Sequence, residues 1–577
     1  MLALPYRLIL LSLFSITAFA HSVTRTTTTN LAQRDTNVTK DNFVTQVGEK
    51  LMVNGSEFKF LGTTAYWLSS LNTDEDIDFT LGNISQAGFN VVRTWAFNDV
   101  DQIPENGTWF QLIQNGTLTI NNGTNGLQKL DRVMELAQKH GVYVLLSLTN
   151  NWNPHPTDTV NITDPLSVFR FGKRDVPAGA NNTRPRGTLS NDYGGMDLYV
   201  RQFGGPQEHD QFYTNQTLVS AFKNYTSQIV TRYRDHPNVL SWELANDPRC
   251  NSSVSASPGC VPQNVTRWHA DIAQHVKSID PNHIVSTGHQ GFRCVGCPKL
   301  FPLQTAPPPV VSPAPGSRRR NAVPLTRERL MRERKEAFKK SRAAAKRSTG
   351  EGGIRIRGRW VSTPTRRQLD PGSTADNGSF GVDSEDIINI PDIDMSSIML
   401  FPDQNSYGPN DPNLPPFNNT VNQGLDWIRQ HAEVGRVFGK PVTLSGIGIV
   451  TQENAPDFVP FNTTVAPFAS DANTGTTPGQ QPFATNAQAS DALNQWLNAG
   501  VINGIQGMIQ YQWTQPGLTV QPGTVINSPT SPVDGQTPTT PVNTQTGTSP
   551  NDGYGTNDVG SLAATIQSVG QNFLPNT

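Results

Sequence analysis

The chain has 577 residues, of which 35% are hydrophobic and 16% charged, so it can bury a large core and is not disordered as a whole. The formal net charge of −2 hides an uneven distribution: residues 318–367 hold 18 basic and 4 acidic residues, a net +14, and the remainder carries −16. A basic block therefore interrupts an acidic body, and each needs its own interpretation.

Residues 1–20 have the pattern of a secretory signal peptide. Arg7 precedes the apolar run 8–14, and Ala18-Phe19-Ala20 supplies a small-residue cleavage site. The run is shorter than the ~20 residues needed to cross a bilayer, and no later segment is long enough. We therefore predict a secreted, extracellular protein with a leader at 21–41 and no membrane partner; a buried N-terminal helix is the alternative.

From residue 58 onward, short apolar runs alternate with amphipathic stretches. The strand candidates are 58–62, 89–94, 142–148, 239–242, 283–286, 393–400, 441–444 and 505–511. The helix candidates are 75–87, 127–140, 216–234, 264–279, 421–438, 485–499 and 558–573. Eight strands that alternate with helices predict an α/β fold, a (β/α)8 TIM barrel with long loop insertions. Residues 42–301 and 376–577 would form its two parts.

Three segments break this alternation. Residues 153–190 are polar and rich in Pro and Asn, and residues 516–552 are rich in Pro, Thr and Gly. Residues 302–375 carry the basic block between Pro-rich flanks. Their composition predicts that most of 302–375 and 516–552 is disordered.

The insertion at 302–375, which contains the basic block, has several possible interpretations. A disordered insertion between the fifth and sixth strand units is favoured. The alternatives are contact with anionic cell-wall polymers, cleavage at the dibasic pairs Lys339-Lys340 and Lys346-Arg347, and a faulty gene model. Nucleic acid is the usual target of such a run. No recognition motif accompanies the block and a secreted chain rarely meets nucleic acid, so we predict no such partner.

Two further features fit secretion. About fifteen N-x-[ST] sequons, among them Asn83, Asn106 and Asn224, indicate a glycoprotein. The four cysteines are Cys250, Cys260, Cys294 and Cys297. Two disulfides are expected in an oxidising compartment, and the local pairs 250–260 and 294–297 require the least rearrangement of the chain. A zinc site is the alternative.

The carboxyl ends of barrel strands form the active sites of such folds, and here they carry aromatic, amide and charged residues. The ends of the second, third, fourth and eighth strands read Arg93-Thr94-Trp95, Asn150-Asn151-Trp152, Glu243-Leu244-Ala245-Asn246-Asp247 and Tyr511-Gln512-Trp513. Sugar rings have apolar faces between hydroxyl groups, so this mixture suits a carbohydrate cleft. Ordinary core packing of Trp95 and Trp152 is the alternative.

Together these motifs resemble fungal endo-β-1,4-mannanases of glycoside hydrolase family five. The resemblance covers residues 42–298 and 376–570 and includes Thr64–Leu68, Asn191–Met196 and Asn551–Tyr554. It implies a (β/α)8 barrel that acts as a monomer on β-mannan-type cell-wall polysaccharide, without a cofactor or a metal. The substrate-binding positions that it implies are Trp67, Arg93, Trp95, Asn151, Trp152, Asn246, Gln290, Met399, Tyr511 and Trp513.

The chain departs from the family pattern at five strand ends. The acid/base glutamate of Asn-Glu-Pro is replaced by Asp247, and the nucleophile glutamate by Gly446. Gln290 replaces the glutamate of Gly-x-Glu-Gly-Phe, and Tyr511 replaces a cleft tryptophan. The sixth strand ends in Met399-Leu400-Phe401-Pro402, where the family has a histidine near an aromatic-Pro pair. The divergence is therefore concentrated in the site.

These changes impair the family mechanism at its matched positions. A retaining glycosidase needs two carboxyl groups about 5–5.5 Å apart, and an inverting one needs them about 6.5–9.5 Å apart. Gly446 cannot form a glycosyl-enzyme intermediate, and Asp247 is one methylene shorter than glutamate, although a misplacement of ~1 Å already lowers a rate about a hundredfold. Arg93, which supports the nucleophile in the family, needs another anion, either Asp247 or Glu243.

Two rescues are conceivable: a water beside Gly446 with Glu453 as base, or catalysis by Glu243. A solvated loop position for Glu453 and a structural role for Glu243 are favoured instead. Three functions remain open: an enzyme with an altered mechanism, a catalytically inactive carbohydrate-binding protein, and a barrel that no longer binds sugar. The residues alone favour the second. The third is expected if Trp67, Trp152 and Trp513 do not line one cleft.

Overall fold

The computed structural model describes residues 42–155, 186–303, 373–460, 483–526 and 546–555, together with short pieces at 354–356, 359–361, 565–566, 568–570 and 573–574. The predicted signal peptide and leader at 1–41 lie outside these residues. So do 156–185, 527–545 and most of the basic block. The predictions made for those segments stay predictions.

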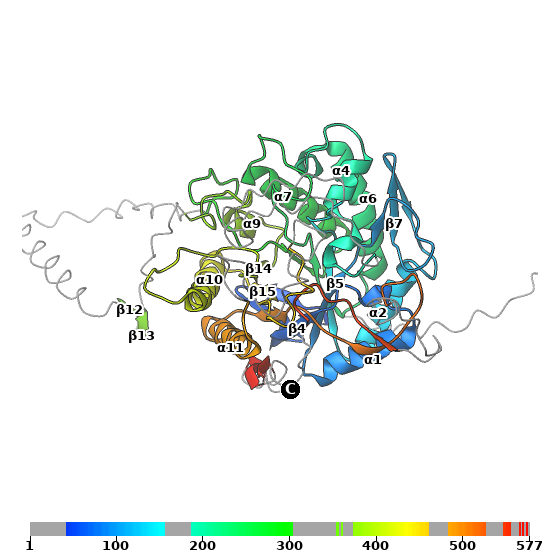
Figure 1. The fold of residues 1–577 in the computed structure, drawn as a ribbon. Coiled ribbons are helices and arrows are strands. Elements are labelled where there is room, and N and C mark those ends of the chain that lie inside the picture. The colour runs from blue at the N-terminus through cyan, green and yellow to red at the C-terminus, as the bar shows by residue number, and fades with distance from the viewer. Residues whose placement is uncertain are drawn as a thin grey trace, which may run out of the picture. The chain divides into compact units, whose positions relative to one another are not determined.

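Eight parallel strands form the centre of the fold (Figure 1). They are β4 (Phe60–Thr64), β5 (Val91–Trp95), β9 (Tyr143–Ser147), β10 (Val239–Glu243), β11 (Ile284–Ser286), β14 (Ser396–Leu400), β15 (Val442–Ile447) and β16 (Gly507–Gln510). Their spatial order is β11-β10-β9-β5-β4-β16-β15-β14. A parallel bridge between Ser286 and Met395 joins the two ends of this order, so the sheet is nearly closed into a barrel. The predicted α/β TIM-barrel fold is confirmed.

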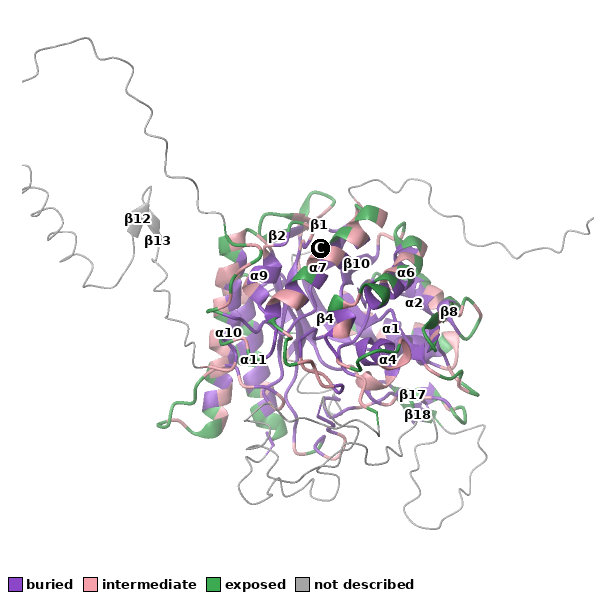
Figure 2. Cartoon of the chain, turned by 90° about the horizontal axis from the view of Figure 1, so that it is seen from above, coloured by how far each residue is buried: buried purple, intermediate pink, exposed green. Residues whose placement is uncertain are grey.

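Helices follow the strands and cover the outside of the sheet, with exposed residues on their outer faces (Figure 2). The long helices are α1 (Asp74–Gln86), α2 (Leu127–Lys139), α6 (Gln216–Tyr233), α7 (Pro262–Ile279), α10 (Pro416–Phe438) and α11 (Asn486–Asn503). Helix α10 begins five residues before its predicted start, because Pro416 occupies the first turn, where a missing N–H costs nothing. The predicted helix at 558–573 lies largely outside the described residues.

Several short elements were not predicted. One antiparallel sheet joins β1 (Thr45–Val47), β2 (Lys50–Val53) and β3 (Ser56–Phe58), and another sheet joins β6 (Asp99–Val100), β7 (Gln111–Gln114) and β8 (Thr117–Ile120). The short helices are η2 (Leu68–Ser70), η3 (Ser190–Tyr193), α4 (Met196–Gln202), α5 (Gln211–Thr214) and α9 (Ser384–Ile388). Leu51 and Phe58 pack on the first residues of barrel strands, such as Phe60 and Val91, so the N-terminal sheet closes the amino end of the barrel.

Two of the long insertions contain paired strands. Within the basic block, β12 (Ile354–Ile356) pairs with β13 (Arg359–Val361), and the ends of the C-terminal loop pair as β17 (Pro516–Thr519) and β18 (Thr546–Thr548). The prediction that most of residues 302–375 and 516–552 are disordered did not include these two pairs of strands. In both cases a local antiparallel contact supplies the backbone hydrogen bonds.

The four cysteines form the two local disulfides, Cys250–Cys260 and Cys294–Cys297. None is left free to bind zinc, so the zinc alternative is wrong. The first disulfide follows β10 and the second follows β11. Both therefore fasten loops that leave the carboxyl ends of barrel strands. Among the described residues, no helix is long and apolar enough to span a bilayer.

Candidate functional site

The end of β5 meets the end of β10 in a buried ion pair. Arg93 Nε lies 3.1 Å from Glu243 Oε1, and Arg93 Nη2 lies 2.5 Å from the same oxygen. The guanidinium also donates to Asn246 Oδ1 at 2.8 Å and lies over the ring of Trp95, 4.9 Å from its centroid. Of the two anions expected for Arg93, the structure selects Glu243. The Glu243 carboxylate is therefore occupied by its ion pair with Arg93.

Asp247 is held by a second buried ion pair. Arg249 Nε donates to Asp247 Oδ1 at 3.0 Å, and Arg249 Nη2 donates to Oδ2 at 2.6 Å. Oδ2 also accepts from Trp152 Nε1 at 2.8 Å. A general acid needs a proton on one oxygen and a free path to the leaving group. Both oxygens of Asp247 are instead acceptors for N–H donors, and the residue is only 5% exposed.

The backbone fixes this geometry. Asp247 has φ +54°, a left-handed conformation that aspartate tolerates better than most residues. Its N–H donates to Gly288 O at 2.9 Å, which ties the end of β10 to the loop after β11. The short side chain and this turn direct the carboxylate back toward Arg249, two residues further along the chain.

Side chains fill the space next to Gly446. A Cβ added at this glycine would lie 3.0 Å from Phe401 Cζ and 3.4 Å from Met399 Cγ. Phe401 is in turn surrounded by Tyr511 and Tyr554, with each ring centroid 5.4 Å away. Phe401 and Met399 therefore occupy the space into which a side chain at position 446 would extend. Glu453, suggested as the base for a water beside Gly446, is exposed and accepts from Asn486 Nδ2 at 3.1 Å.

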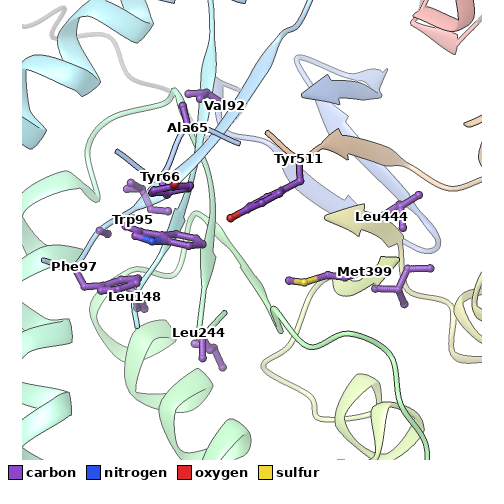
Figure 3. Close-up of a cluster of buried hydrophobic side chains, with 14 of the residues drawn as sticks. Ala65, Tyr66, Val92, Trp95, Phe97, Leu148, Leu244, Met399, Leu444 and Tyr511 are labelled. Atoms are coloured by element: carbon purple, nitrogen blue, oxygen red, sulfur yellow. The ribbon is translucent and has the colours of Figure 1, made fainter. Parts of the chain in front are cut away.

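Tyr511 at the end of β16 connects the two sides of the barrel mouth. Its ring stacks on Tyr66 with centroids 6.4 Å apart, and Figure 3 shows its hydroxyl directed toward Tyr66 and Trp95. The hydroxyl donates to Asp552 Oδ2 at 2.8 Å. Burial, followed by the negative charge of Asp552, raises the pKa of Tyr511 well above its usual value. The phenol is therefore a hydrogen-bond donor and not a nucleophile.

Gln290 and Met399 come together from neighbouring strands. Met399 N–H donates to Gln290 O at 3.0 Å. The Gln290 side-chain oxygen accepts from Asn405 Nδ2 at 2.9 Å and from Tyr407 Oη at 3.2 Å. Both residues are buried. Their contacts hold the loop after β14 against the loop after β11.

Asn151 also has structural partners. Its Oδ1 accepts from Tyr213 Oη at 3.1 Å and from Arg249 N–H at 3.1 Å, and it lies 2.9 Å from His209 Nε2. Its Nδ2 donates to Asn251 O at 2.9 Å. Asn151 therefore connects the third and fourth strand ends and supports the loop that carries Arg249.

The three tryptophans used as a test for an open cleft have different environments. Trp67 is fully buried and Trp152 is 4% exposed. Trp513 is half-buried, with its ring 5.9 Å from that of Phe89 and its Nε1 bonded to Gln515. Because two of the rings are buried and the third is half-buried, the three rings do not form one exposed platform.

Ser190 Oγ also donates to Asp552 Oδ2, at 2.8 Å. Sequence reasoning did not identify Asp552, Ser190 or Arg249 as members of this site. Arg249 lies two residues after Asp247, and Asp552 lies within the Asn551–Tyr554 motif, so both were visible as sequence. Their roles depend on loops folding back over the barrel mouth, which no local pattern indicates. The described residues include no group of three His, Cys, Asp or Glu side chains that could hold a metal ion.

The chain is similar in sequence to a known protein family. Residues 41–302 match the family model described as GH family 5 beta-mannosidase-like. The match covers 262 of the 577 residues, just under half of the chain. The resemblance predicted from the strand-end motifs is confirmed.

Fungal mannanases are among the most similar curated proteins. Mannan endo-1,4-beta-mannosidase F of Aspergillus fumigatus is 36% identical over 253 residues, which are 43% of this chain and 47% of that protein. A probable mannan endo-1,4-beta-mannosidase A-2 of Aspergillus terreus is 33% identical over 254 residues, 44% of this chain and 52% of that protein. The chain thus spans about half the length of the curated relatives that it matches.

Solved family 5 structures extend the similarity to the rest of the barrel. The endo-1,4-beta-mannanase of Rhizomucor miehei superposes with a TM-score of 0.54 at 21% identity, over 92% of this chain and 99% of that chain. An endo-1,4-beta-D-mannanase of Thermotoga petrophila gives 0.52 at 19% identity, over 89% of this chain and 100% of that chain. At these identities the comparison establishes the fold alone.

Proposed function

We propose that this protein is a non-hydrolytic relative of the family 5 mannanases that binds β-mannan-type polysaccharide. The observation that carries the first part is the state of Asp247, whose two oxygens accept hydrogen bonds from Arg249 and Trp152. The second part rests on the relatives, whose names give mannan as their substrate.

Hydrolysis by the family route needs two carboxyl groups that reach the scissile bond. Position 446 is a glycine with Phe401 packed 3.0 Å from where its Cβ would be. Glu243, the other carboxylate at these strand ends, is bound by Arg93 and fully buried. Glu243 and Asp247 are therefore each neutralised by an arginine. Breaking either pair to free a carboxylate would leave a buried charge without a partner.

We further propose that the protein works outside the cell as a monomer, with polysaccharide as its partner and without nucleic acid. The signal-peptide pattern of residues 1–20 supports export. The two disulfides are consistent with an oxidising compartment.

The experiment separates binding from turnover. To measure turnover, purified protein is incubated with soluble galactomannan, and reducing ends and released oligosaccharides are measured. To measure binding, the retardation of the protein is followed in a native gel that contains the same polymer. We expect retardation without new reducing ends. Asp247→Ala is the matched control for trace activity.

Two outcomes would overturn the proposal. Product formation that disappears in Asp247→Ala would show that this aspartate is catalytic despite its pairing with Arg249. The absence of retardation by galactomannan and by other soluble β-glycans would mean that the barrel no longer binds sugar. That is the function expected above if Trp67, Trp152 and Trp513 do not line one cleft, and the burial of Trp67 and Trp152 agrees with it.

A further inference from the structure

Asp552 is a buried carboxyl group that belongs to neither ion pair of the site. It reaches the barrel mouth from the segment 546–555, far in sequence from its neighbours. Its Oδ2 accepts hydrogen bonds from Ser190 Oγ and from Tyr511 Oη, both at 2.8 Å. Three separate parts of the chain, around η3, at the end of β16 and after β18, therefore meet at one carboxyl group.

The other oxygen of this group is unsatisfied. Asp552 Oδ1 is buried and has no hydrogen-bond partner within the described part of the chain, and the residue as a whole is only 7% exposed. Leaving a buried polar atom without a partner costs free energy, so folded proteins usually provide one. Within the described residues, no group supplies a hydrogen bond to this oxygen.

The chemistry of the carboxyl group indicates which ligand fits. Burial raises the pKa of Asp552, whereas the hydrogen bonds from Ser190 and Tyr511 act in the opposite direction. The acid form therefore persists to higher pH than in an exposed aspartate. A hydroxyl group satisfies Oδ1 in both forms, since it accepts from the acid and donates to the carboxylate.

The surroundings add apolar faces to this polar contact. Tyr511 stacks on Tyr66, and Tyr66 stacks on Trp95 with centroids 6.1 Å apart. These rings lie beside the Asp552 contact, because the Tyr511 hydroxyl is one of its two donors. Tyr66 and Trp95 are almost fully buried, so they surround the carboxyl group with apolar surface and leave the unsatisfied oxygen as the polar contact. A sugar ring combines hydroxyl groups with apolar C–H faces, which fits a polar contact in such surroundings.

We propose that Asp552, held by Ser190 and Tyr511, forms a hydrogen bond with a hydroxyl group of a bound sugar ring. The inference rests on the proposed polysaccharide binding and assigns it a residue outside the positions taken from the family. Asp99 provides the contrast within the chain. Its Oδ2 is also buried and unpaired among the described residues, but Gly194 lies close against this residue: a Cβ at Gly194 would lie 2.5 Å from Asp99 Cβ.

The test measures affinity for β-1,4-mannohexaose by titration calorimetry in the full-length protein and in Asp552→Asn, Tyr511→Phe and Asp99→Asn. We expect Asp552→Asn to weaken binding at least tenfold, equivalent to about 1.4 kcal/mol, and Tyr511→Phe to weaken it by a smaller factor. Asp99→Asn should bind as the unmodified protein does. Thermal unfolding of each variant checks that a weaker ligand contact is not a loss of fold.

A second readout separates ligand contact from support of the fold. Monodeoxy analogues of β-1,4-mannobiose compete with mannohexaose for the unmodified protein. The analogue that lacks the contacted hydroxyl should compete poorly, and Asp552→Asn should no longer distinguish it from mannobiose. A purely structural Asp552 would leave this discrimination unchanged in the variant, and that result would overturn the inference.

The outcomes distinguish the inference from the function on which it rests. Equal affinities of Asp552→Asn and the unmodified protein for mannohexaose would overturn the inference and leave the proposed function standing. Binding of cellohexaose but not mannohexaose, weakened by Asp552→Asn, would support the inference and overturn the mannan assignment. Failure to bind any oligosaccharide of a mannan, glucan and xylan panel would overturn both.

Discussion

Asp247 and Arg249 are two residues apart in the sequence, and their side chains form an ion pair with 6% and 1% of their surfaces exposed. The guanidinium also lies 5.4 Å from the ring centroid of Trp152 and 5.1 Å from that of Phe380. A buried pair of this kind contributes little net free energy, but the loss of one partner is costly because the other charge stays buried.

We therefore expect Arg249→Met to lower the free energy of unfolding by about 3–5 kcal/mol, the range for one partner lost from a buried pair. The double variant Asp247→Asn with Arg249→Met should lose less than the single one, because no uncompensated charge remains. Urea denaturation measures both. Arg429→Met removes an exposed pair with Asp426 and should change stability by less than about 1 kcal/mol. Equal losses in the single and double variants would contradict this explanation.

Gly446 and Gly296 provide a matched pair for the second prediction. An added Cβ at Gly446 meets Phe401 at 3.0 Å, whereas nothing lies within 4 Å of one at Gly296. We expect Gly446→Ala to cost about 1–3 kcal/mol through overpacking and Gly296→Ala to be close to neutral, as measured by thermal unfolding. Phe401→Leu should recover part of the loss in the Gly446→Ala background. Identical unfolding temperatures for the two alanine variants would show that Phe401 moves aside freely.

At the scale of elements, the barrel strands and long helices were predictable because their residues are buried in regular patterns. All five residues of β5 and of β10 are buried, as expected for parallel strands covered on both faces. The short elements over the carboxyl ends lack such periodicity. The η3 turn is defined by glycines and side-chain contacts, and β6 has only two residues.

The contact between the loops after β10 and β11 leads to the third prediction. Gly288 has φ +75°, and a Cβ there would lie 1.7 Å from Ala245 O. Gly141 has φ +68° with nothing within 4 Å. Gly141→Ala should lose only the cost of a left-handed residue, about 1–2 kcal/mol, and Gly288→Ala should lose at least twice as much because two backbones collide. Similar chemical denaturation midpoints for the two variants would contradict this close approach.

At the scale of the whole molecule, three histidines are buried in the layer between barrel and helices. His269 lies on α7, His289 follows β11 and His431 lies on α10, and the rings of His269 and His289 are 6.4 Å apart. Burial lowers the pKa of His269 to about 4 and that of His431 to about 3, and it lowers the pKa of His289 well below its usual value. The folded protein thus holds them neutral.

This arrangement predicts loss of stability in acid. The unfolded chain binds a proton at each histidine below pH ~6.5, and the folded chain does so only below its lowered pKa. The contribution of each neutral histidine to the free energy of unfolding is complete above pH ~6.5. It is lost as the pH falls toward 4, with a slope of about 1.4 kcal/mol per pH unit for each histidine. His269→Gln should therefore show a shallower decline of urea midpoint between pH 6.5 and 4. His140→Gln, at a surface pair with Asp78, is the control. Parallel declines for His269→Gln and the unmodified protein would contradict it.

The sequence was sufficient to single out the positions that depart from the family pattern. The structure was needed to learn which side chains contact those positions. Gly446 and Asp247 stood out because the strand-end motifs are otherwise kept. The partners of the altered positions come from distant loops: Phe401 packs on Gly446, and Ser190 meets Asp552 across 362 residues. Such pairings follow from barrel closure and loop packing, which local patterns do not encode.

If the protein is non-hydrolytic, as proposed, the packing of Phe401 against Gly446 makes that state difficult to reverse by single mutations. A glutamate restored at 446 would collide with the phenylalanine ring, and a smaller residue at 401 alone would leave a cavity beside Tyr511 and Tyr554. A glutamate at 247 would still face Arg249. Every first step back toward a glycosidase therefore lowers stability before it returns any activity. Under the proposed function, single substitutions that change binding are therefore expected to be tolerated more readily than substitutions that introduce hydrolysis.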